Sequence, residues 1–333
     1  MVWYKNKGQI MEFFKESKVY DFMAKSKLFI SISLFFIVGS YILLFTKGLN
    51  FGIDFTGGTI IQVKYDKPAN IKEIREALKG NDIFKDASVT EFGSDEEIII
   101  RVKSSTKKLG QDIGDIARDI LKDTGNFEIR RVDIVGPKVG SELREKGIMA
   151  MIIAIIGILI YISIRFEWRF ALASVLALVH DVSIALGAIS LLNIPVNLDI
   201  LAAILTLLGY SLNDTIIVFD RIREGIVEAK TDDLKKVINI SVSKTLSRTT
   251  LTSLTTFFVV LTLFLFGGEI LKGFSFTLLL GVIIGTYSSI FVASPLLVWL
   301  RFNLKNYRAK LAQKKKREQE KERIRAMYER GVV

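Results

Sequence analysis

Long apolar runs separated by polar segments divide the chain into alternating parts. A helix needs about 20 predominantly apolar residues to cross roughly 30 Å of hydrocarbon, because each residue adds 1.5 Å. Six runs meet this requirement, namely 28–46, 147–165, 170–192, 197–219, 248–267 and 274–300. The pattern predicts a polytopic α-helical membrane protein with six transmembrane helices.

The segment between the first two runs has the composition and periodicity of a soluble domain. Alternation of apolar and polar positions predicts strands, and spacings of three to four residues predict helices. The elements in order are strand 59–65, helix 71–78, a hairpin of strands 87–92 and 97–103 around Gly93, helix 113–121 and strand 127–135. This βαββαβ order predicts one small α+β ferredoxin-like domain with both helices on one face of its sheet. It contains no histidine, and its carboxylates lie among lysines, so we expect a recognition or lever domain.

The distribution of basic residues predicts which side of the membrane each segment occupies. The formal net charge is +11, and the excess of Lys and Arg is concentrated in 1–27, 165–169, 221–248 and 301–333. Cytoplasmic segments of membrane proteins carry such an excess. We therefore expect a multi-pass protein of the plasma (inner) membrane with both termini in the cytoplasm. Because the charge follows topology, we expect anionic lipids at the basic tail and no nucleic-acid partner.

Together these patterns predict five parts. They are a cytoplasmic N-terminal segment 1–27, a first transmembrane helix 28–46, an extracytoplasmic domain 47–146, a five-helix remainder of the membrane domain 147–300 with a cytoplasmic loop 221–247, and a basic cytoplasmic tail 301–333.

Several kinds of site are excluded by composition. The chain has no cysteine and a single histidine, His180, so neither a thiolate site nor a histidine-rich metal site can form. The phosphate-binding pattern GxxxxGK[ST] is missing as well. We expect no metal, no cofactor and no enzymatic activity.

Four sequence blocks resemble the SecD/SecF family of protein-export membrane proteins. They are FGIDFTGG at 51–58, LVHDVSIALG at 178–187, GYSLNDTIIVFDRIRE at 209–224 and TLSRTTLTSLTT at 245–256. With the order of spans and domain, the resemblance covers residues 25–300.

The resemblance implies a fold similar to half of an RND-type transporter. The other half, SecD, must be a separate chain, because this sequence holds one FGIDFTGG-like block and one set of six spans. The implied activity is use of the proton-motive force to assist Sec-dependent protein export. The implied partners are SecD, the translocon channel complex and unfolded preproteins.

Two ionisable residues are candidates for a proton relay. Asp214 lies deep in the fourth run, and a charge at membrane depth costs about 2.5 to 3.5 kcal/mol on insertion scales. Its carboxylate either accepts protons or makes a structural hydrogen bond between helices. Arg248 precedes an apolar stretch too short to cross the membrane, so the fifth span must begin near it. Together with the resemblance, this predicts a pair of Asp214 and Arg248, in which Arg248 modulates the proton affinity of the carboxylate.

Other polar residues near these positions could form a secondary relay or a water path. Asp181 and His180 lie in the middle of the third run, where adjacent helical residues point about 100° apart and cannot both face one partner. His180 is equally compatible with packing. Further hydroxyl and amide candidates are Ser211, Asn213, Thr249 and Thr252.

The signature block after the first span is a candidate hinge between the membrane and the outer domain. Glycines permit backbone conformations with positive φ and close approach. The alternative is a simple tight turn. The residues concerned are Phe51, Gly52, Asp54, Thr56, Gly57 and Gly58.

Two other functions are compatible with a polytopic protein carrying buried carboxylates. A proton-coupled small-solute exporter of the RND superfamily would usually have a larger outer domain with a drug-sized pocket. An intramembrane aspartyl protease could use Asp181 and Asp214, but its usual GxGD context is missing here.

Overall fold

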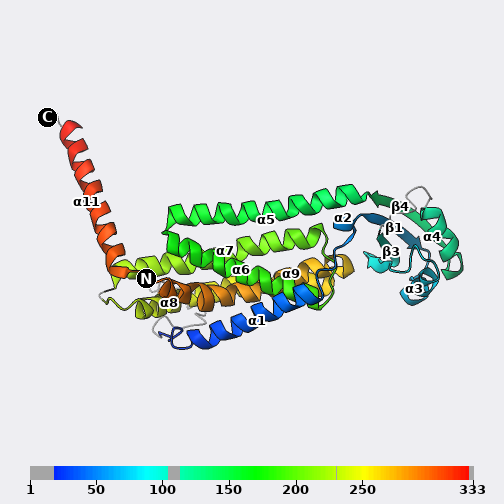
Figure 1. Ribbon diagram of the computed structural model, residues 1–333, viewed down its shortest axis with the longest axis horizontal. Helices are drawn as coiled ribbons and strands as arrows, with labels where there is room; N and C mark the ends of the chain where they lie inside the picture. Colours follow the sequence, from blue (N-terminus) through cyan, green and yellow to red (C-terminus); the bar gives the residue numbers. More distant parts are fainter. Residues whose placement is uncertain (1–18, 104–112, 230, 330–333) are drawn as a thin grey trace, which may run out of the picture.

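The computed structural model describes residues 19–103, 113–229 and 231–329. Figure 1 shows a bundle of long helices with a small α/β domain at one end, while helix α11 leaves the other end. Within the described residues, six helical stretches are long and apolar enough to cross a membrane. Five of them are α1 (Ser26–Thr46), α5 (Pro137–Arg165), α6 (Trp168–Leu191), α7 (Leu198–Glu228) and α8 (Leu234–Phe266). The sixth combines α9 (Gly268–Ser288), the π-helical segment η2 (Ser289–Ala293) and α10 (Ser294–Trp299). The prediction of six spans is confirmed.

Several helices extend beyond the apolar runs. The prediction places the end of the outer domain at 146, whereas its last strand ends at Val135 and α5 begins at Pro137. Proline is favoured at the first position of a helix, where no intrahelical N–H bond is lost. Charged residues fill the first turns of α5, so hydropathy alone could not include them.

The expected cytoplasmic loop 221–247 is mostly helical, which corrects that prediction. α7 continues to Glu228 and α8 starts at Leu234, so the connection is short. The Asp233 side chain accepts a hydrogen bond from the backbone N–H of Lys235 (3.0 Å) and so caps α8. The helical extensions are amphipathic and bury Ile226 and Val237 in the core of the bundle.

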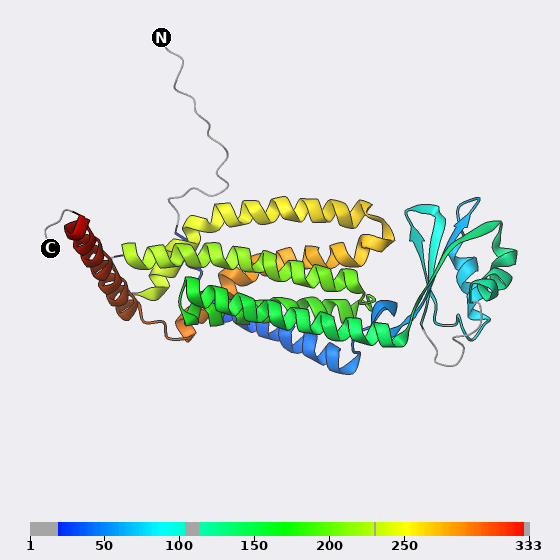
Figure 2. The ribbon, with the colours of Figure 1, turned by 90° about the horizontal axis from the view of Figure 1, so that it is seen from above.

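The outer domain has the predicted βαββαβ order. Its elements are β1 (Gly58–Tyr65), α3 (Ile71–Lys79), β2 (Ser88–Phe92), β3 (Ser94–Lys103), α4 (Ile113–Leu121) and β4 (Phe127–Val135). All neighbours in the sheet are antiparallel, in the order β2-β3-β1-β4. Its core joins alternate strand residues such as Ile61 and Ile100 to Ile74 of α3 and Leu121 of α4. Figures 1 and 2 show both helices on the side of the sheet away from the bundle, so its other face turns toward the membrane helices.

The basic tail is helical over α11 (Leu304–Glu329). Arg308 fixes its start, since the guanidinium donates hydrogen bonds to the carbonyl oxygens of Ile226 (2.6 Å), Ala229 and Thr231 (3.1 Å) and pairs with Asp232 (3.2 Å). α1 begins at the same end of the bundle as α11 (Figure 1). Most of the expected N-terminal segment 1–27 lies outside the described residues, as do 330–333 of the tail.

Candidate functional site

Asp214 lies where α7, α8 and α9 meet in the middle of the bundle. It is fully buried, and its Oδ2 accepts hydrogen bonds from Ser253 on α8 (3.1 Å) and Thr286 on α9 (3.4 Å). The Thr286 hydroxyl is also 2.7 Å from that of Ser253. The Oδ1 atom of Asp214 has no hydrogen-bond partner within the described part of the chain. The carboxylate therefore links three helices through one oxygen and keeps the other available.

The structure does not bring Arg248 to Asp214, which corrects the expected pair. Arg248 is exposed on α8, and the described residues contain no ion pair between the two side chains. On α8, Thr249 and Ser253 are one turn apart and both are buried, so this face points toward α7 and α9. Arg248 lies about 100° away from Thr249 around the helix and points outward.

The remaining hydroxyl and amide candidates divide between the interior and the surface. Thr249 is buried with an unpaired hydroxyl, and Tyr210, one turn before Asp214, also has a buried unpaired hydroxyl among the described residues. Thr252 is exposed and bonds to carbonyl oxygens of its own helix, and Asn213 is exposed on α7. Buried polar groups are nearly always paired, so Tyr210, Thr249 and Asp214 Oδ1 are exceptions among the described residues.

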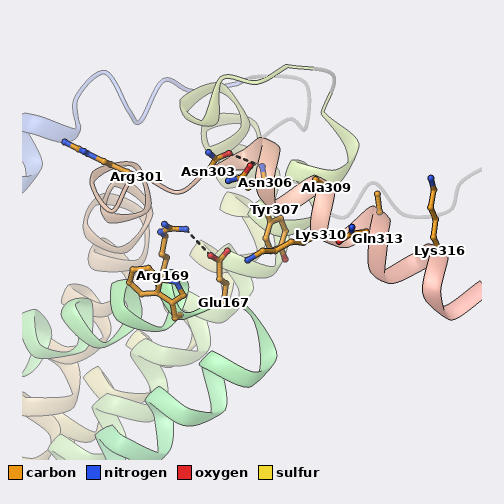
Figure 3. Close-up of a pocket in the computed structure, with 12 residues that line it drawn as sticks. Glu167, Arg169, Arg301, Asn303, Asn306, Tyr307, Ala309, Lys310, Gln313 and Lys316 are labelled. Atoms are coloured by element: carbon orange, nitrogen blue, oxygen red, sulfur yellow. Dashed lines mark hydrogen bonds and ion pairs between the residues drawn. The ribbon is translucent and has the colours of Figure 1, made fainter.

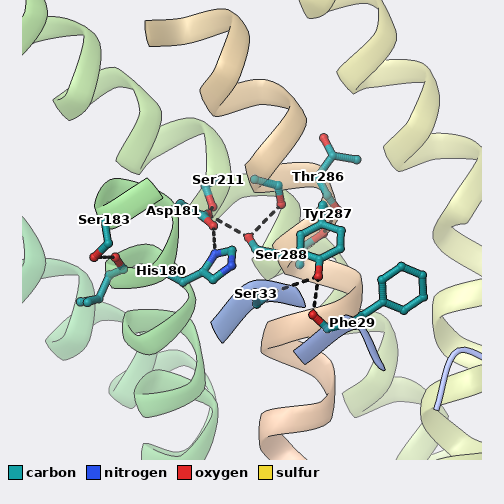
Figure 4. A network of polar contacts seen from close by, with 12 residues as sticks. Phe29, Ser33, His180, Asp181, Ser183, Ser211, Thr286, Tyr287 and Ser288 are labelled. Atoms are coloured by element: carbon teal, nitrogen blue, oxygen red, sulfur yellow. Dashed lines mark hydrogen bonds and ion pairs between the residues drawn. The ribbon is translucent and has the colours of Figure 1, made fainter. Parts of the chain in front are cut away.

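Asp181 on α6 is the centre of a second polar cluster, shown in Figure 4. It is fully buried; its Oδ1 is 2.7 Å from Nδ1 of His180, and its Oδ2 accepts hydrogen bonds from Ser211 of α7 and Ser288 of α9 (2.8 Å). The two neighbours on α6 thus contact each other, an arrangement that the sequence argument did not consider.

His180 connects this cluster to α1. Its ring stacks on Tyr287 of α9, with the ring centroids 6.2 Å apart. The Tyr287 hydroxyl donates to the carbonyl oxygen of Phe29 (2.7 Å) and lies 2.9 Å from the Ser33 hydroxyl (Figure 4). The last span therefore contributes residues that sequence reasoning missed, including Thr286, Tyr287 and Ser288. The available signal was the GxxxG pair Gly281 and Gly285, which brings α9 against α7 just before these residues.

The two carboxylates are separate sites. No hydrogen bond joins Asp181 to Asp214 in the described structure, and each accepts hydrogen bonds from its own hydroxyls. An aspartyl protease requires two carboxylates close enough to share a proton. This geometry therefore gives no support to the protease alternative. Among the described residues there is also no group of three His, Cys, Asp or Glu residues that could hold a metal ion.

The signature block is bound to the start of α7. The N–H of Gly52 donates to the carbonyl oxygen of Val196 (2.9 Å), and the N–H of Val196 donates to the carbonyl oxygen of Asn50 (2.8 Å). Asp54, in the short helix α2 (Ile53–Thr56), accepts a hydrogen bond from the N–H of Leu198 (3.0 Å). A carboxylate at this place satisfies a free N–H and complements the positive end of the helix dipole.

The glycines of the block lie where the two connections to the outer domain meet. Gly57 has φ +77°, and a Cβ on it would lie 2.8 Å from Cα of Pro137 at the start of α5. A Cβ on Gly140 would lie 2.8 Å from the N atom of Gly57. The chain entering β1 and the chain leaving β4 are therefore in direct backbone contact. Thr56 closes the short helix by donating to the carbonyl oxygen of Gly52 (3.0 Å), and Phe51 forms an isolated bridge with Val196.

Arg101 of β3 faces this junction from the outer domain. It lines two neighbouring pockets between the sheet and the ends of the membrane helices, and its guanidinium donates to the Thr90 hydroxyl (2.9 Å). Burial lowers the pKa of Arg101, and the carboxylates of Asp199 and Asp54 act in the opposite direction. Negative charges on α2 and at the start of α7 therefore favour the charged guanidinium of the outer domain.

A polar pocket of about 840 Å³ lies at the opposite end, between α11 and the start of α6. Figure 3 shows Glu167 paired with Arg169 (3.1 Å) beside Tyr307 and Lys310 of α11. The guanidinium of Arg169 also lies over the ring of Trp168, 4.8 Å from its centroid. Tryptophan and arginine side chains together are typical of a membrane–water interface.

Comparison with known families matches most of the chain to one of them. Residues 116–303 match the family described as protein export membrane protein SecD/SecF, C-terminal, and residues 42–69 match the SecD/SecF GG motif. The protein translocase subunit SecF of Helicobacter pylori (strain J99) is 48% identical over 97% of this chain and 100% of its own length. The SecF subunit of Escherichia coli O157:H7 is 42% identical over 84% of this chain and 87% of its own length.

Solved structures of a longer protein share the fold. A crystal structure of SecDF, described as a translocon-associated membrane protein from Thermus thermophilus, matches with a TM-score of 0.76 and 32% identity over 86% of this chain. SecDF in its super-membrane-facing form matches with a TM-score of 0.67 and 32% identity over 89% of this chain. The chain spans 39% and 40% of the lengths of those two chains.

Proposed function

The chain belongs to the SecF family of protein translocase subunits, and from this membership we propose that it uses the proton-motive force to assist Sec-dependent protein translocation. It acts as an accessory subunit without a cofactor of its own. The observation that supports proton use is the buried Asp214 carboxylate, with one oxygen bound by hydroxyls from two other helices and the other oxygen unpaired among the described residues.

A change in protonation of Asp214 alters its contacts. An ionised carboxylate only accepts hydrogen bonds, whereas a protonated one also donates. Uptake of a proton therefore changes what Asp214 offers to Ser253 and Thr286, and it removes the cost of a buried charge. The proton biases the bundle only if the two arrangements differ in these contacts. We propose that the proton binds at Oδ1, the oxygen of Asp214 that has no hydrogen-bond partner among the described residues.

The start of α7 carries this change to the outer domain. Asp214 and Leu198 are 16 residues apart on α7, which corresponds to about 24 Å along the helix axis. Asp54 binds the N–H of Leu198, and α2 leads directly into β1. We therefore assign the signature block the role of a joint that transmits motion of α7. The outer domain then binds unfolded preprotein as it emerges and favours its forward movement.

SecD as a separate chain is the partner that completes the transporter-like bundle. Arg248 and Asn213 are exposed side chains on membrane helices, and charged or amide groups are costly in lipid. We propose that SecD covers this surface and that Arg248 contacts SecD there. The translocon channel complex is the further partner of this assembly. In this arrangement both termini lie in the cytoplasm, the outer domain lies outside the plasma (inner) membrane, and the basic tail contacts anionic lipids.

Replacement of Asp214 by asparagine tests the proton role. Asp214→Asn keeps the size of the side chain but removes its titration, so we expect pulse-labelled export of a secreted precursor to fall to the level of cells depleted of the chain. Asp220→Asn is the matched control on the same helix, because Asp220 is partly exposed and pairs with Arg223 (2.8 Å). Normal export in Asp214→Asn under full proton-motive force would refute the proposal.

A further inference from the structure

Asp181 ties together the helices that surround Asp214. Its Oδ2 accepts from Ser211 on α7 and Ser288 on α9. Ser211 is three residues before Asp214, and Ser288 is two residues after Thr286, which contacts Asp214. One buried carboxylate on α6 therefore fixes the relative position of the two helices that hold the other carboxylate.

The contact between α7 and α9 has no free space. A Cβ on Gly285 would lie 3.0 Å from Cβ of Ser211, and a Cβ on Gly281 would lie 3.3 Å from Cβ of Leu207. Such close packing of small residues brings helix backbones together in membranes. The α7–α9 contact is thus held by packing and by the Asp181 hydrogen bonds.

In the described structure α8 makes no hydrogen bond to Asp181, and it is the most exposed of these four spans. In its most apolar window 17% of residues are buried, compared with 56% for α6 and for the last span and 44% for α7. At the level of Asp214, α8 contributes the Ser253 hydroxyl, while the Thr249 hydroxyl is unpaired within the described structure. A change at Asp214 therefore reaches, through Ser253, a helix that Asp181 does not bind.

We infer that Asp181 is a positioning residue that locks α6, α7 and α9 into one unit, against which α8 changes its contacts when Asp214 is protonated. This inference rests on the proposed function. It assigns Asp181 a role other than carrying protons. The neutral, isosteric side chain in Asp181→Asn keeps an oxygen that can accept both hydroxyl hydrogen bonds. Asp181→Ala removes them and leaves a cavity.

A covalent substitute for the lock provides the test. The chain has no cysteine, so a disulfide within it can form only between the two engineered cysteines. The pair Leu207→Cys with Gly281→Cys joins α7 to α9, because the Cβ separation of 3.3 Å is close to the 3.5–4.5 Å of disulfides. We expect Asp181→Ala to lose export, oxidation of this pair to restore it, and reduction of the same sample to abolish it again. Asp181→Asn should retain export.

A matched cross-link at another contact is the control. The pair Gly225→Cys with Ser241→Cys has a Cβ separation of 3.7 Å and joins α7 to α8, so it should not rescue Asp181→Ala. The inference is overturned if the α7–α9 disulfide blocks export in the otherwise unchanged chain, if it fails to rescue Asp181→Ala, or if Asp181→Asn is inactive. Inactivity of Asp181→Asn would instead indicate a proton carrier. Retained export in Asp214→Asn would refute the proposed function separately, whatever the cross-links show.

Discussion

The hydrogen bond between Asp54 and the start of α7 leads to a prediction about motion of the outer domain. Asp54→Ala removes the acceptor for the N–H of Leu198. Loss of such a cap costs about 1 kcal/mol, which is too little to unfold a domain with its own core. Asp54→Asn keeps an acceptor oxygen at the same place. We therefore expect the two variants to have similar stability. They should differ in how well motion of α7 is transmitted to the outer domain.

The length of α7 sets the size of the signal. A helix tilt of about 5° around Asp214 displaces Leu198 by roughly 2 Å, which is within the range of helix shifts in protein switches. The distance is measured between spin labels on Glu76→Cys of α3 and Leu176→Cys of α6, both of which are exposed. The protein is reconstituted in liposomes with SecD and compared at acidic and alkaline pH.

The expected outcome separates coupling from proton binding. The otherwise unchanged chain and Asp54→Asn should show a pH-dependent change in the distance, Asp214→Asn should show none, and Asp54→Ala should lose most of it. Glu73→Ala, which removes an exposed carboxylate from α3 of the same domain, is the control and should behave like the unchanged chain. A full distance change in Asp54→Ala would refute the joint, and the proton role of Asp214 would remain to be judged by its own variant.

Two further predictions concern stability. Gly57→Ala should lower the melting temperature and impair export, because φ is +77° and the new Cβ would meet Pro137. Gly39→Ala, where the new Cβ has open space, should do neither. The melting temperatures of the two variants are measured by thermal unfolding in detergent, and equal values would contradict the packing argument. Truncation after Lys305 should lower the melting temperature, because it removes Arg308 and its hydrogen bonds. Truncation after Ala309 keeps Arg308 and should leave the melting temperature unchanged. An identical effect of both truncations would show that the Arg308 contacts add no stability.

The fold followed from hydrophobic periodicity because each element has a clear pattern. The six spans and the βαββαβ order are as predicted, and strand and helix limits in the outer domain agree within a few residues. The errors occur where amphipathic helix continues past the lipid. α5 starts ten residues before 147 and α8 starts fourteen residues before 248. Hydropathy identifies the part of a helix that crosses the hydrocarbon. It does not identify the parts that lie outside the lipid and are stabilised by packing.

The sequence predicted the central residue of the candidate site but not the partners of that residue. A buried carboxylate can be found by its cost, so Asp214 and Asp181 were identifiable from the sequence. Their partners depend on rotation of each helix about its axis, which hydropathy does not determine when a helix is apolar on all sides. Arg248 and Thr249 are adjacent, yet one is exposed and the other is buried. Close packing at Gly281 and Gly285 decides which face of α9 meets α7, so this GxxxG pair was the sequence feature that pointed to the hydroxyls of α9.

Hydroxyl partners rather than an arginine suit the proton role that we propose for Asp214. A guanidinium at hydrogen-bond distance would stabilise the ionised form strongly, because opposite charges attract most in a low dielectric. Serine and threonine hydroxyls can donate to a carboxylate and accept from a carboxylic acid, so both states of Asp214 can be satisfied by small rotations of Ser253 and Thr286. The proposed proton role of Asp214 therefore needs no ion pair with Arg248, and the described residues contain none.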